Sequence, residues 1–302
     1  MIEKSLTKCA ICGTYDNSQV VLKSNLDDKS FSTEVFSARR IPDRRYYQWV
    51  KCSECGLLRS DPIREIALDE LYKKSKFDYG FEIQGLKKTY MKLLSKSGFS
   101  DKTSAKILEI GGGNGFFLDA VLDKFPEAKV VGVEPSLDAV EKSSERVRPF
   151  MIASMMNSKL FANSTFNYAC IFHVLDHLPD PDVTLSQIYD SLESQGVVVI
   201  AVHNSKSWSA RLFKEKSPIF DVEHTYLYDK KTLSKILEKS NFNLVRISSY
   251  SNKYSLLYLL QLSPIPSGIK LKAMNSSVIS NLLKNIRITF PLGNIVAIGR
   301  KS

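Results

Sequence analysis

The chain has 302 residues, of which 43% are hydrophobic and 25% charged, the ordinary balance of a globular protein with room for one medium domain and one small one. Its longest apolar run near the C-terminus, residues 254–262, is about half the length of a membrane-spanning helix, and its first residues form no apolar signal segment. We therefore exclude a transmembrane protein and expect a cytoplasmic one. The net charge of +10 favours partners that carry phosphate: nucleic acid, nucleotide sugars or an anionic membrane surface.

Four of the five cysteines form two CxxC pairs near the N-terminus: Cys9 with Cys12, and Cys52 with Cys55. In an intracellular chain this spacing favours a metal over disulfides. Two pairs of thiolates can fill all four positions of a tetrahedral zinc ion, which is the pattern of a structural site. A redox pair or unrelated surface cysteines are the alternatives. The fifth, Cys170, stands in an apolar run and is interpreted as a buried residue.

Basic and aromatic residues alternate between the two cysteine pairs. They are Arg39, Arg40, Arg44, Arg45, Tyr46, Tyr47 and Trp49. This composition could neutralise phosphates and stack on bases. The favoured interpretation is a solvated loop followed by a strand that leads into the second cysteine pair.

Three regions follow one another along the chain. Residues 1–70 hold the cysteine module, and residues 71–103 are predicted to be linker helices and a lid, because apolar residues recur at helical spacing between Leu68 and Ser97. Residues 104–302 form the third region. There, apolar runs at 107–110, 130–133, 150–152, 168–172 and 197–202 alternate with helical stretches at 116–125, 137–147 and 183–192. This alternation predicts an α/β fold with a parallel sheet covered by helices on both faces.

The end of this third region is predicted from capping and apolar signals. Asp229 is expected to cap a helix that runs to about Ser240. A strand near 244–248 and a last strand at 294–299 complete a count of seven, and the residues near 250–290 between them are an insertion.

A glycine-rich turn follows the first of these strands. Glycines at 111, 113 and 115 let the backbone approach a ligand, and the following helix offers free N–H groups. The dinucleotide fingerprint GxGxxG would need glycine at position 116, where Phe116 stands, so a nicotinamide cofactor is disfavoured. The next strand ends at Glu134, whose carboxylate can accept hydrogen bonds from both hydroxyls of a ribose.

The pattern Glu109-x-Gly111-x-Gly113-x-Gly115, the acidic Glu134 and residues 174–181 (VLDHLPDP) together resemble class I methyltransferases over roughly residues 104–302. The resemblance implies a Rossmann-like seven-stranded sheet and S-adenosylmethionine as cofactor. It places Gly111 and Gly113 beside the methionine moiety and Glu134 on the ribose. The cofactor-binding residues that we expect are Glu109, Gly111, Gly113, Glu134, Met155 and His173. Met155 enters because the loop 153–157 lacks the acidic residue with which many relatives bind adenine.

The cysteine module, followed by a helix with Leu71 and Tyr72, resembles the N-terminal region of methyltransferases that act on sugars in antibiotic and surface-polysaccharide pathways. This resemblance implies a small-molecule or glycan acceptor, nucleotide-linked and lipid-linked forms included. It leaves open whether oxygen, nitrogen or carbon is methylated. The competing interpretations are a nucleic-acid-binding or RNA-modifying protein and a non-catalytic relative.

All four histidines lie in the second half of the chain. Glu223 and His224 resemble the Glu-His segment of sugar C-methyltransferases, in which the histidine is the general base, so both are predicted to be catalytic. A structural role for His224 is the alternative. His203 is expected to line the acceptor pocket, and His177 to brace a loop.

The insertion combines the apolar run 254–262 with prolines and with basic residues among apolar ones. The basic residues are Lys270, Lys272, Lys284 and Arg287. Packing in the core or between two copies is favoured over docking on a membrane that carries a lipid-linked glycan.

Overall fold

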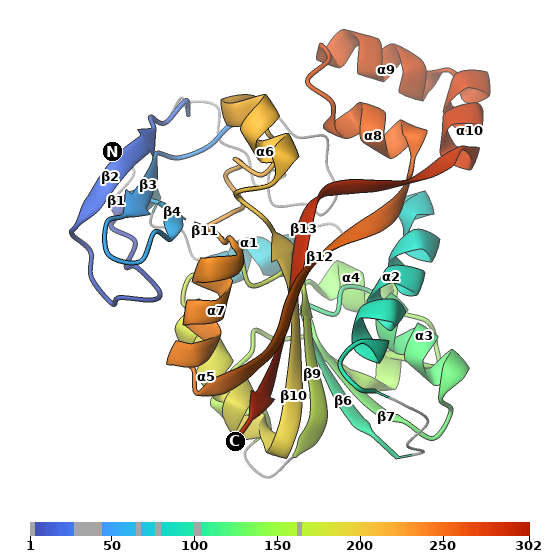
Figure 1. Cartoon of the computed structure of the whole chain (residues 1–302). Coiled ribbons are helices and arrows are strands. Elements are labelled where there is room, and N and C mark those ends of the chain that lie inside the picture. Colours follow the sequence, from blue (N-terminus) through green and yellow to red (C-terminus); the bar gives the residue numbers. More distant parts are fainter. Residues whose placement is uncertain (1–3, 27–43, 65–67, 76–79, 100–103, 162–164) are drawn as a thin grey trace.

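The computed structural model describes residues 4–26, 44–64, 68–75, 80–99, 104–161 and 165–302 (Figure 1). Its centre is a seven-stranded sheet with the order β12-β13-β10-β9-β6-β7-β8. The strands are β6 (Lys106–Ile110), β7 (Lys129–Val133), β8 (Met151–Ile152), β9 (Phe166–Phe172), β10 (Leu192–His203), β12 (Phe242–Ser255) and β13 (Arg287–Lys301). Strands β6 to β10 are parallel, and β13 is antiparallel to both of its neighbours. The seven-stranded α/β sheet expected from the sequence is confirmed.

The central strands β6, β9 and β10 are buried on both faces of the sheet, because their main stretches are almost continuously apolar. In β10, Val198 and Ile200 pack on one face while Val199 and Ala201 pack on the other. The helices α5 (Pro181–Ser191) and α7 (Lys230–Lys239) cover the first face. The helices α2 (Ile83–Ser95), α3 (Phe116–Lys124) and α4 (Leu137–Glu141) cover the second.

Helix α7 begins where the sequence predicts. The Asp229 carboxylate accepts a hydrogen bond from the Thr232 backbone N–H at 2.8 Å, and the Thr232 hydroxyl accepts one from the Asp229 N–H at 2.9 Å. This reciprocal pair satisfies two of the N–H groups that a helix start leaves unbonded.

Two predicted helices are shorter than their apolar spacing suggested. The helical pattern from Leu68 to Ser97 is divided into α1 (Leu68–Lys74), the 3-10 turn η2 (Gly80–Glu82) and α2. The predicted helix over 137–147 stops with α4, because the Ser144 carbonyl accepts the N–H groups of Val147 and Arg148 in a turn. Two further 3-10 turns, η3 (Arg148–Phe150) and η4 (Ser158–Phe161), surround β8.

The last two strands are much longer than predicted. β12 and β13 continue beyond the sheet as a two-stranded ribbon, with register shifts between Leu244 and Arg246 and between Tyr250 and Asn252. The predicted strand 294–299 is the buried part of β13. In β12 the prediction at 244–248 covers half-buried and exposed residues, and the buried positions Tyr250, Asn252 and Tyr254 were missed because polar groups there give no apolar pattern. Three helices, α8 (Leu256–Leu262), α9 (Ser267–Asn275) and α10 (Ser277–Asn285), lie at the end of this ribbon (Figure 1). We call residues 256–285 the C-terminal cap.

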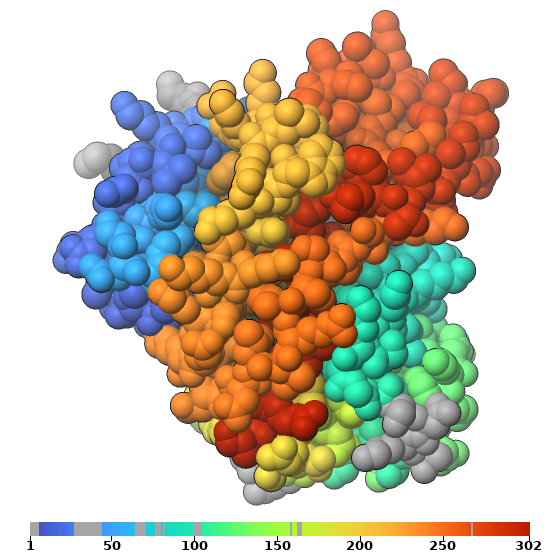
Figure 2. All heavy atoms as spheres, in the orientation of Figure 1, coloured from blue at the N-terminus to red at the C-terminus, as the bar shows by residue number. Residues whose placement is uncertain are grey.

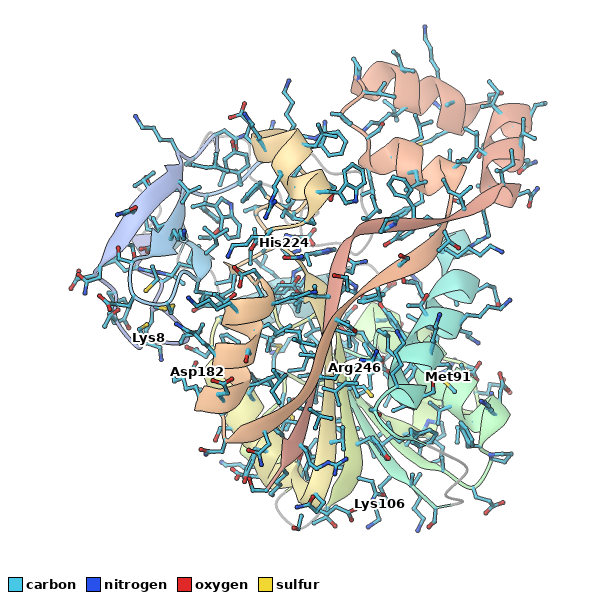
Figure 3. The ribbon with its side chains drawn as sticks, viewed as in Figure 1. Lys8, Met91, Lys106, Asp182, His224 and Arg246 are labelled. Atoms are coloured by element: carbon cyan, nitrogen blue, oxygen red, sulfur yellow. The ribbon has the colours of Figure 1, made fainter. Side chains whose placement is uncertain are left out.

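The N-terminal module has its own small sheet of β2 (Ser18–Leu22), β3 (Trp49–Cys52) and β4 (Leu58–Ser60). Its fourth strand, β11 (Tyr226–Leu227), comes from the segment just before α7, far from the module in sequence, and pairs antiparallel with β4. A separate strand pair joins β1 (Lys4–Ser5) to β5 (Ile63–Arg64). Lys8 of the module also lies 3.7 Å from the Asp182 carboxylate of α5 (Figure 3).

Between β10 and β11 lie the helix α6 (Trp208–Phe213) and the 3-10 turn η5 (Lys214–Lys216). Within the ranges that the structure describes, every helix is too short or too polar to cross a bilayer.

Candidate active site

The glycine turn after β6 has a backbone that only glycine adopts readily. Gly111, Gly113 and Gly115 all have positive φ angles, of 70°, 53° and 68°. A side chain at Gly111 would also collide with Val174. The N–H groups of Gly111 and Gly112 donate to the Val133 carbonyl and so fix the turn against the end of β7.

Glu134, directly after β7, faces this turn. One carboxylate oxygen accepts the Gly113 N–H and the other accepts the Ser136 N–H, each at 2.9 Å. Burial raises the pKa of Glu134, and these two N–H donors partly offset the rise. Each carboxylate oxygen keeps a second lone pair, so the group can still accept ribose hydroxyls.

Glu109, inside β6, is a buried acid without a hydrogen-bond partner for its Oε2 atom among the described residues. Glu109 is 2% exposed. Its pKa is raised well above the usual range, mainly by burial and to a smaller extent by the charge of Glu134. An unpartnered buried carboxyl group beside a cavity suits a ligand that brings a positive charge or a hydrogen-bond donor. S-adenosylmethionine brings both, so the residues present fit this cofactor.

A single cavity of about 590 Å³ joins these groups to the histidines. The six residues predicted to bind the cofactor, Glu109, Gly111, Gly113, Glu134, Met155 and His173, all line it. Glu223 and His224, the two predicted catalytic residues, line it as well. The structure therefore brings together all eight residues in one place, although their individual roles stay predictions.

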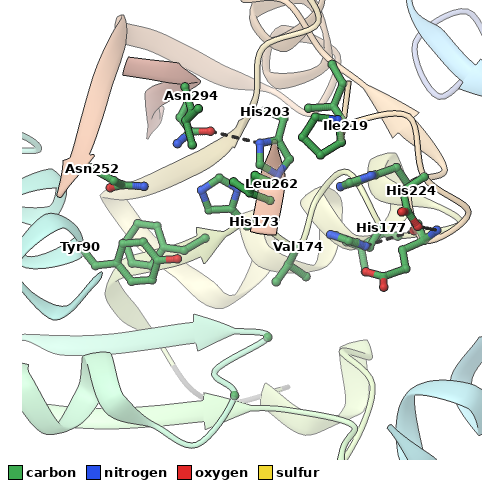
Figure 4. Close-up of a pocket in the computed structure, with 18 of the residues that line it drawn as sticks. Tyr90, His173, Val174, His177, His203, Ile219, His224, Asn252, Leu262 and Asn294 are labelled. Carbon is green, nitrogen blue, oxygen red and sulfur yellow. Dashed lines mark hydrogen bonds between the residues drawn. The ribbon is translucent and has the colours of Figure 1, made fainter. Parts of the chain in front are cut away.

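All four histidines of the sequence lie along one wall of this cavity (Figure 4). The ring centres of His173 and His203 are 4.7 Å apart, those of His203 and His224 are 5.4 Å apart, and those of His177 and His224 are 4.5 Å apart. The ends of β9 and β10 and the loops that follow α6 and β9 thus converge on one site. Carboxyl ends of parallel strands are the usual place for ligands in such sheets.

Asp176 is the site residue that sequence reasoning missed. Its side chain is fully buried, and neither carboxylate oxygen has a hydrogen-bond partner among the described residues. The Nε2 atom of His224 lies 3.8 Å from one oxygen, and Nε2 of His177 lies 3.9 Å from the other. The sequence suggests Glu223 as the carboxylate partner of His224 because the two are adjacent. Asp176 is far from His224 in the sequence and therefore gave no such signal.

Glu223 and His177 interact through the backbone. The Nδ1 atom of His177 lies 3.1 Å from the Glu223 carbonyl, and because a carbonyl only accepts, Nδ1 carries the proton (Figure 4). This bond ties the loop after β9 to the segment that contains His224.

Polar residues of the last two strands complete the wall. His173 Nε2 lies 2.8 Å from the Tyr250 hydroxyl, and His203 Nδ1 lies 3.1 Å from the Asn294 side-chain oxygen. The side-chain amides of Asn294 and Asn252 both donate to the Tyr254 hydroxyl. Sequence reasoning did not find Tyr250, Asn252, Tyr254 or Asn294, because polar residues on a strand give no local signal of function.

The cysteine module holds the His224 segment in place. The Ser60 hydroxyl donates to the His224 carbonyl at 3.1 Å, and the Ser60 N–H donates to the Thr225 carbonyl at 2.9 Å. From the other side, the N–H groups of Thr225 and Tyr226 donate to the Asp176 carbonyl. His224 therefore sits between the module and the loop that carries Asp176.

The four cysteines of the module converge. The sulfur atoms of Cys9 and Cys55 are 3.5 Å apart and those of Cys12 and Cys52 are 3.9 Å apart, and all four lie within 4.8 Å of one another. Zn–S bonds of about 2.3 Å in a tetrahedron place sulfur atoms about 3.8 Å apart. Burial alone would raise the pKa of the Cys52 thiol. Backbone N–H donors at residues 54 and 55 lower it by more, so that the pKa is about 7. The cluster fits a tetrahedral metal ion, whereas Cys170 is buried in β9.

The aromatic residues between the cysteine pairs are not available to a nucleic acid. Tyr46, Tyr47 and Trp49 are buried, so the interpretation that they stack on bases is wrong. Arg44 donates to the backbone carbonyls of Lys216 and Ser263, and burial lowers its pKa. The candidate phosphate-binding residues Arg39 and Arg40 lie outside the described residues.

Comparison with known proteins decides the family. The family described as "Methyltransferase domain" matches residues 83–247, more than half of the chain. The chain belongs to this methyltransferase family. It is an S-adenosylmethionine-dependent enzyme, and the glycine turn and Glu134 lie within the matched residues. Among curated protein sequences, none matches the chain.

Several solved structures resemble this enzyme at low identity. A SAM-dependent methyltransferase from Archaeoglobus fulgidus has 22% identity and a TM-score of 0.48, over 74% of this chain and 100% of the other. The YcgJ protein from Bacillus subtilis has 13% identity and a TM-score of 0.48, over 70% and 98%. Magnesium protoporphyrin IX methyltransferase from Synechocystis PCC 6803, with bound SAH, has 11% identity and a TM-score of 0.47, over 72% and 84%. No acceptor follows from these similarities.

Proposed function

We propose that this methyltransferase methylates a sugar or a polysaccharide precursor, free, nucleotide-linked or lipid-linked. The observation that carries the proposal is the polar wall opposite the glycine turn, where histidine, asparagine and tyrosine side chains line one cavity. A sugar presents several hydroxyls close together and needs several donors and acceptors at fixed positions. Trp208 and Phe213 line the same cavity and offer apolar surface to the faces of a sugar ring.

His224 is the group that we assign to proton removal from the acceptor. S-adenosylmethionine supplies a methyl group on a positively charged sulfur, and transfer to a hydroxyl or an acidic carbon releases the proton of that acceptor atom. The imidazole of His224 takes up this proton, and the buried Asp176 carboxylate at 3.8 Å stabilises the imidazolium that results. The rest of the wall orients the acceptor in line with the methyl group.

Zinc, in this proposal, has a structural role. Four thiolates leave no open position for a substrate or a water molecule, so the ion would act only by folding the module. Its influence on catalysis would pass through Ser60, which bonds the backbone at His224 and Thr225.

The proposal is tested by the release of S-adenosylhomocysteine from S-adenosylmethionine in the presence of candidate acceptors. We expect nucleotide sugars to stimulate release from the wild-type enzyme and not from His224→Ala. Stimulation by RNA alone, with loss of RNA binding as salt rises, would contradict the sugar proposal and favour a nucleic-acid acceptor.

A further inference from the structure

The last part of the sequence carries most of the net positive charge of this protein. Residues 239–302 contain nine lysines and arginines and no aspartate or glutamate, so they supply nine of the ten net positive charges. None of these cations lines the cavity. Some of these cations lie away from the cap, since Lys239 pairs with Asp182 of α5 and Lys301 donates to the Tyr189 and Leu192 carbonyls. In the cap, Lys270 is buried, whereas Lys272 and Lys284 reach the surface and the cap contains no acidic residue, which favours an anionic surface as partner.

The C-terminal cap also exposes an apolar surface. In α10, Val278 is 77% exposed, Leu282 is 60% exposed and Ile279 is also exposed, whereas Ser280 is buried. Residues 278, 279 and 282 share one face of the helix. The helix therefore turns its apolar face outward, the reverse of an ordinary surface helix. In α9, Ile269 and Leu271 are exposed beside Lys272.

A second apolar and basic element stands at the same end of the molecule. Figure 2 shows α6, in yellow, and the cap, in orange and red, as two neighbouring lobes. Leu212 of α6 is 64% exposed. Arg211, Lys214 and Lys216 are exposed around it, and Glu215 is the acidic residue of this stretch. Arg44 links the two lobes, because it donates to carbonyls of both Lys216 and Ser263.

We infer that these two lobes, residues 208–216 and the C-terminal cap (residues 256–285), form a docking face for an anionic lipid bilayer. Exposed leucine, isoleucine and valine side chains would enter the region between headgroups and acyl chains while the cations meet lipid phosphates. The charge argues against a second copy as occupant, because two such faces would bring like charges together. A bilayer with anionic lipids neutralises them.

The docking face and the cavity share their elements. Tyr258, Leu259 and Leu262 of the cap and Trp208 of α6 line the cavity. A bilayer on this face would lie next to a cavity wall, which suits an acceptor that carries a lipid. This last step rests on the proposed function; the docking itself does not.

Sedimentation with lipid vesicles tests the proposal on the full chain. We expect binding to phosphatidylcholine vesicles that contain phosphatidylglycerol to be about tenfold or more stronger than binding to pure phosphatidylcholine, and to weaken with salt. Equal binding to both kinds of vesicle, or to neither, would overturn the proposal.

An apolar variant tests the insertion of side chains. Leu212→Ser/Val278→Ser/Leu282→Ser is expected to reduce vesicle binding about tenfold or more. Its matched control is Val183→Ser/Val245→Ser, which changes exposed apolar residues outside the docking face and should bind like the wild type. Unchanged binding by the apolar variant would overturn the proposal.

A charge variant separates the docking face from the net charge. Lys214→Glu/Lys272→Glu should weaken binding to anionic vesicles about tenfold or more, at about 1 kcal/mol for each cation lost. The control Lys106→Glu/Lys129→Glu changes the net charge equally at the opposite end of the sheet, where Figure 3 labels Lys106. An equal loss in both variants would contradict a defined face.

Two further readouts keep the outcomes separate. A dimer in solution that becomes a monomer in the apolar variant would assign the face to a second copy and overturn the proposal. Binding of S-adenosylhomocysteine should be the same in all these variants. Failure of vesicle docking with intact cofactor binding therefore leaves the methyltransferase site unaffected.

Discussion

The cavity has two sides that are built in different ways. The cofactor side comes mainly from one short stretch, in which β6, the glycine turn and the end of β7 bring Gly111, Gly113 and Glu134 together. The side that we propose for the acceptor is assembled from four separate segments, around His203, His224, Asn252 and Asn294. One side depends on local backbone geometry, and the other depends on the packing of distant elements. Substitutions on one side should therefore reduce cofactor affinity, and substitutions on the other should reduce turnover, independently of each other.

The largest effect is expected on the acceptor side. His224→Ala should reduce turnover about 100-fold or more, the usual range for loss of a general base, without changing the affinity for S-adenosylhomocysteine. Asp176→Asn should reduce turnover as well, because it removes the charge that stabilises the imidazolium. The measurement is the release of S-adenosylhomocysteine with a sugar acceptor. Asp190→Asn, which changes an exposed carboxylate on α5, is the control.

The next effect is expected on the cofactor side. Gly111→Ala places a side chain at a positive φ angle and against Val174, so the affinity for S-adenosylhomocysteine should fall about 10- to 100-fold. Calorimetric titration measures it. Gly98→Ala is the matched control, since Gly98 also has a positive φ angle but an added Cβ there meets no atom within 4 Å. Equal losses in both variants would show that strain alone is responsible.

Loss of the proposed zinc ion should separate the two sides indirectly. Cys9→Ser/Cys52→Ser should abolish zinc binding, which we expect at about one ion per chain, and lower Tm by about 10 °C. Turnover should fall about tenfold because Ser60 no longer holds the His224 segment, while cofactor affinity is kept. Zinc analysis, calorimetry and thermal unfolding measure these effects. Cys170→Ala should retain the zinc, and equal loss of turnover and cofactor affinity in the double variant would contradict this view of the module.

The smallest effect concerns pH and the buried acid Glu109. Its pKa is raised in the folded protein, so its contribution to stability is complete below the unfolded value of 4.5 and is lost as pH rises through the folded value. Glu109→Gln, which mimics the protonated form, should therefore raise Tm more at pH 8 than at pH 5. Thermal unfolding without cofactor checks this. A wild-type protein that is as stable as the variant at both pH values would contradict it.

The same contrast explains what could be predicted from the sequence. The glycine turn, Glu134, the cysteine pairs and the Asp229 cap are local patterns, and the structure places each where the pattern put it. Asp176 was missed because its partner His224 lies far along the chain. The pairing of β11 with β4 was missed for the same reason, since a two-residue strand has no periodicity of its own.

The most direct test of a cavity with two independent sides is calorimetric titration of S-adenosylhomocysteine into the wild type, Glu134→Gln and His224→Ala. We predict micromolar binding to the wild type, which corresponds to about −8 kcal/mol. Glu134→Gln should bind about tenfold or more weakly, and His224→Ala should bind like the wild type. A wild type that does not bind, or a His224→Ala variant that loses as much affinity as Glu134→Gln, would contradict the division of the cavity into a cofactor side and an acceptor side.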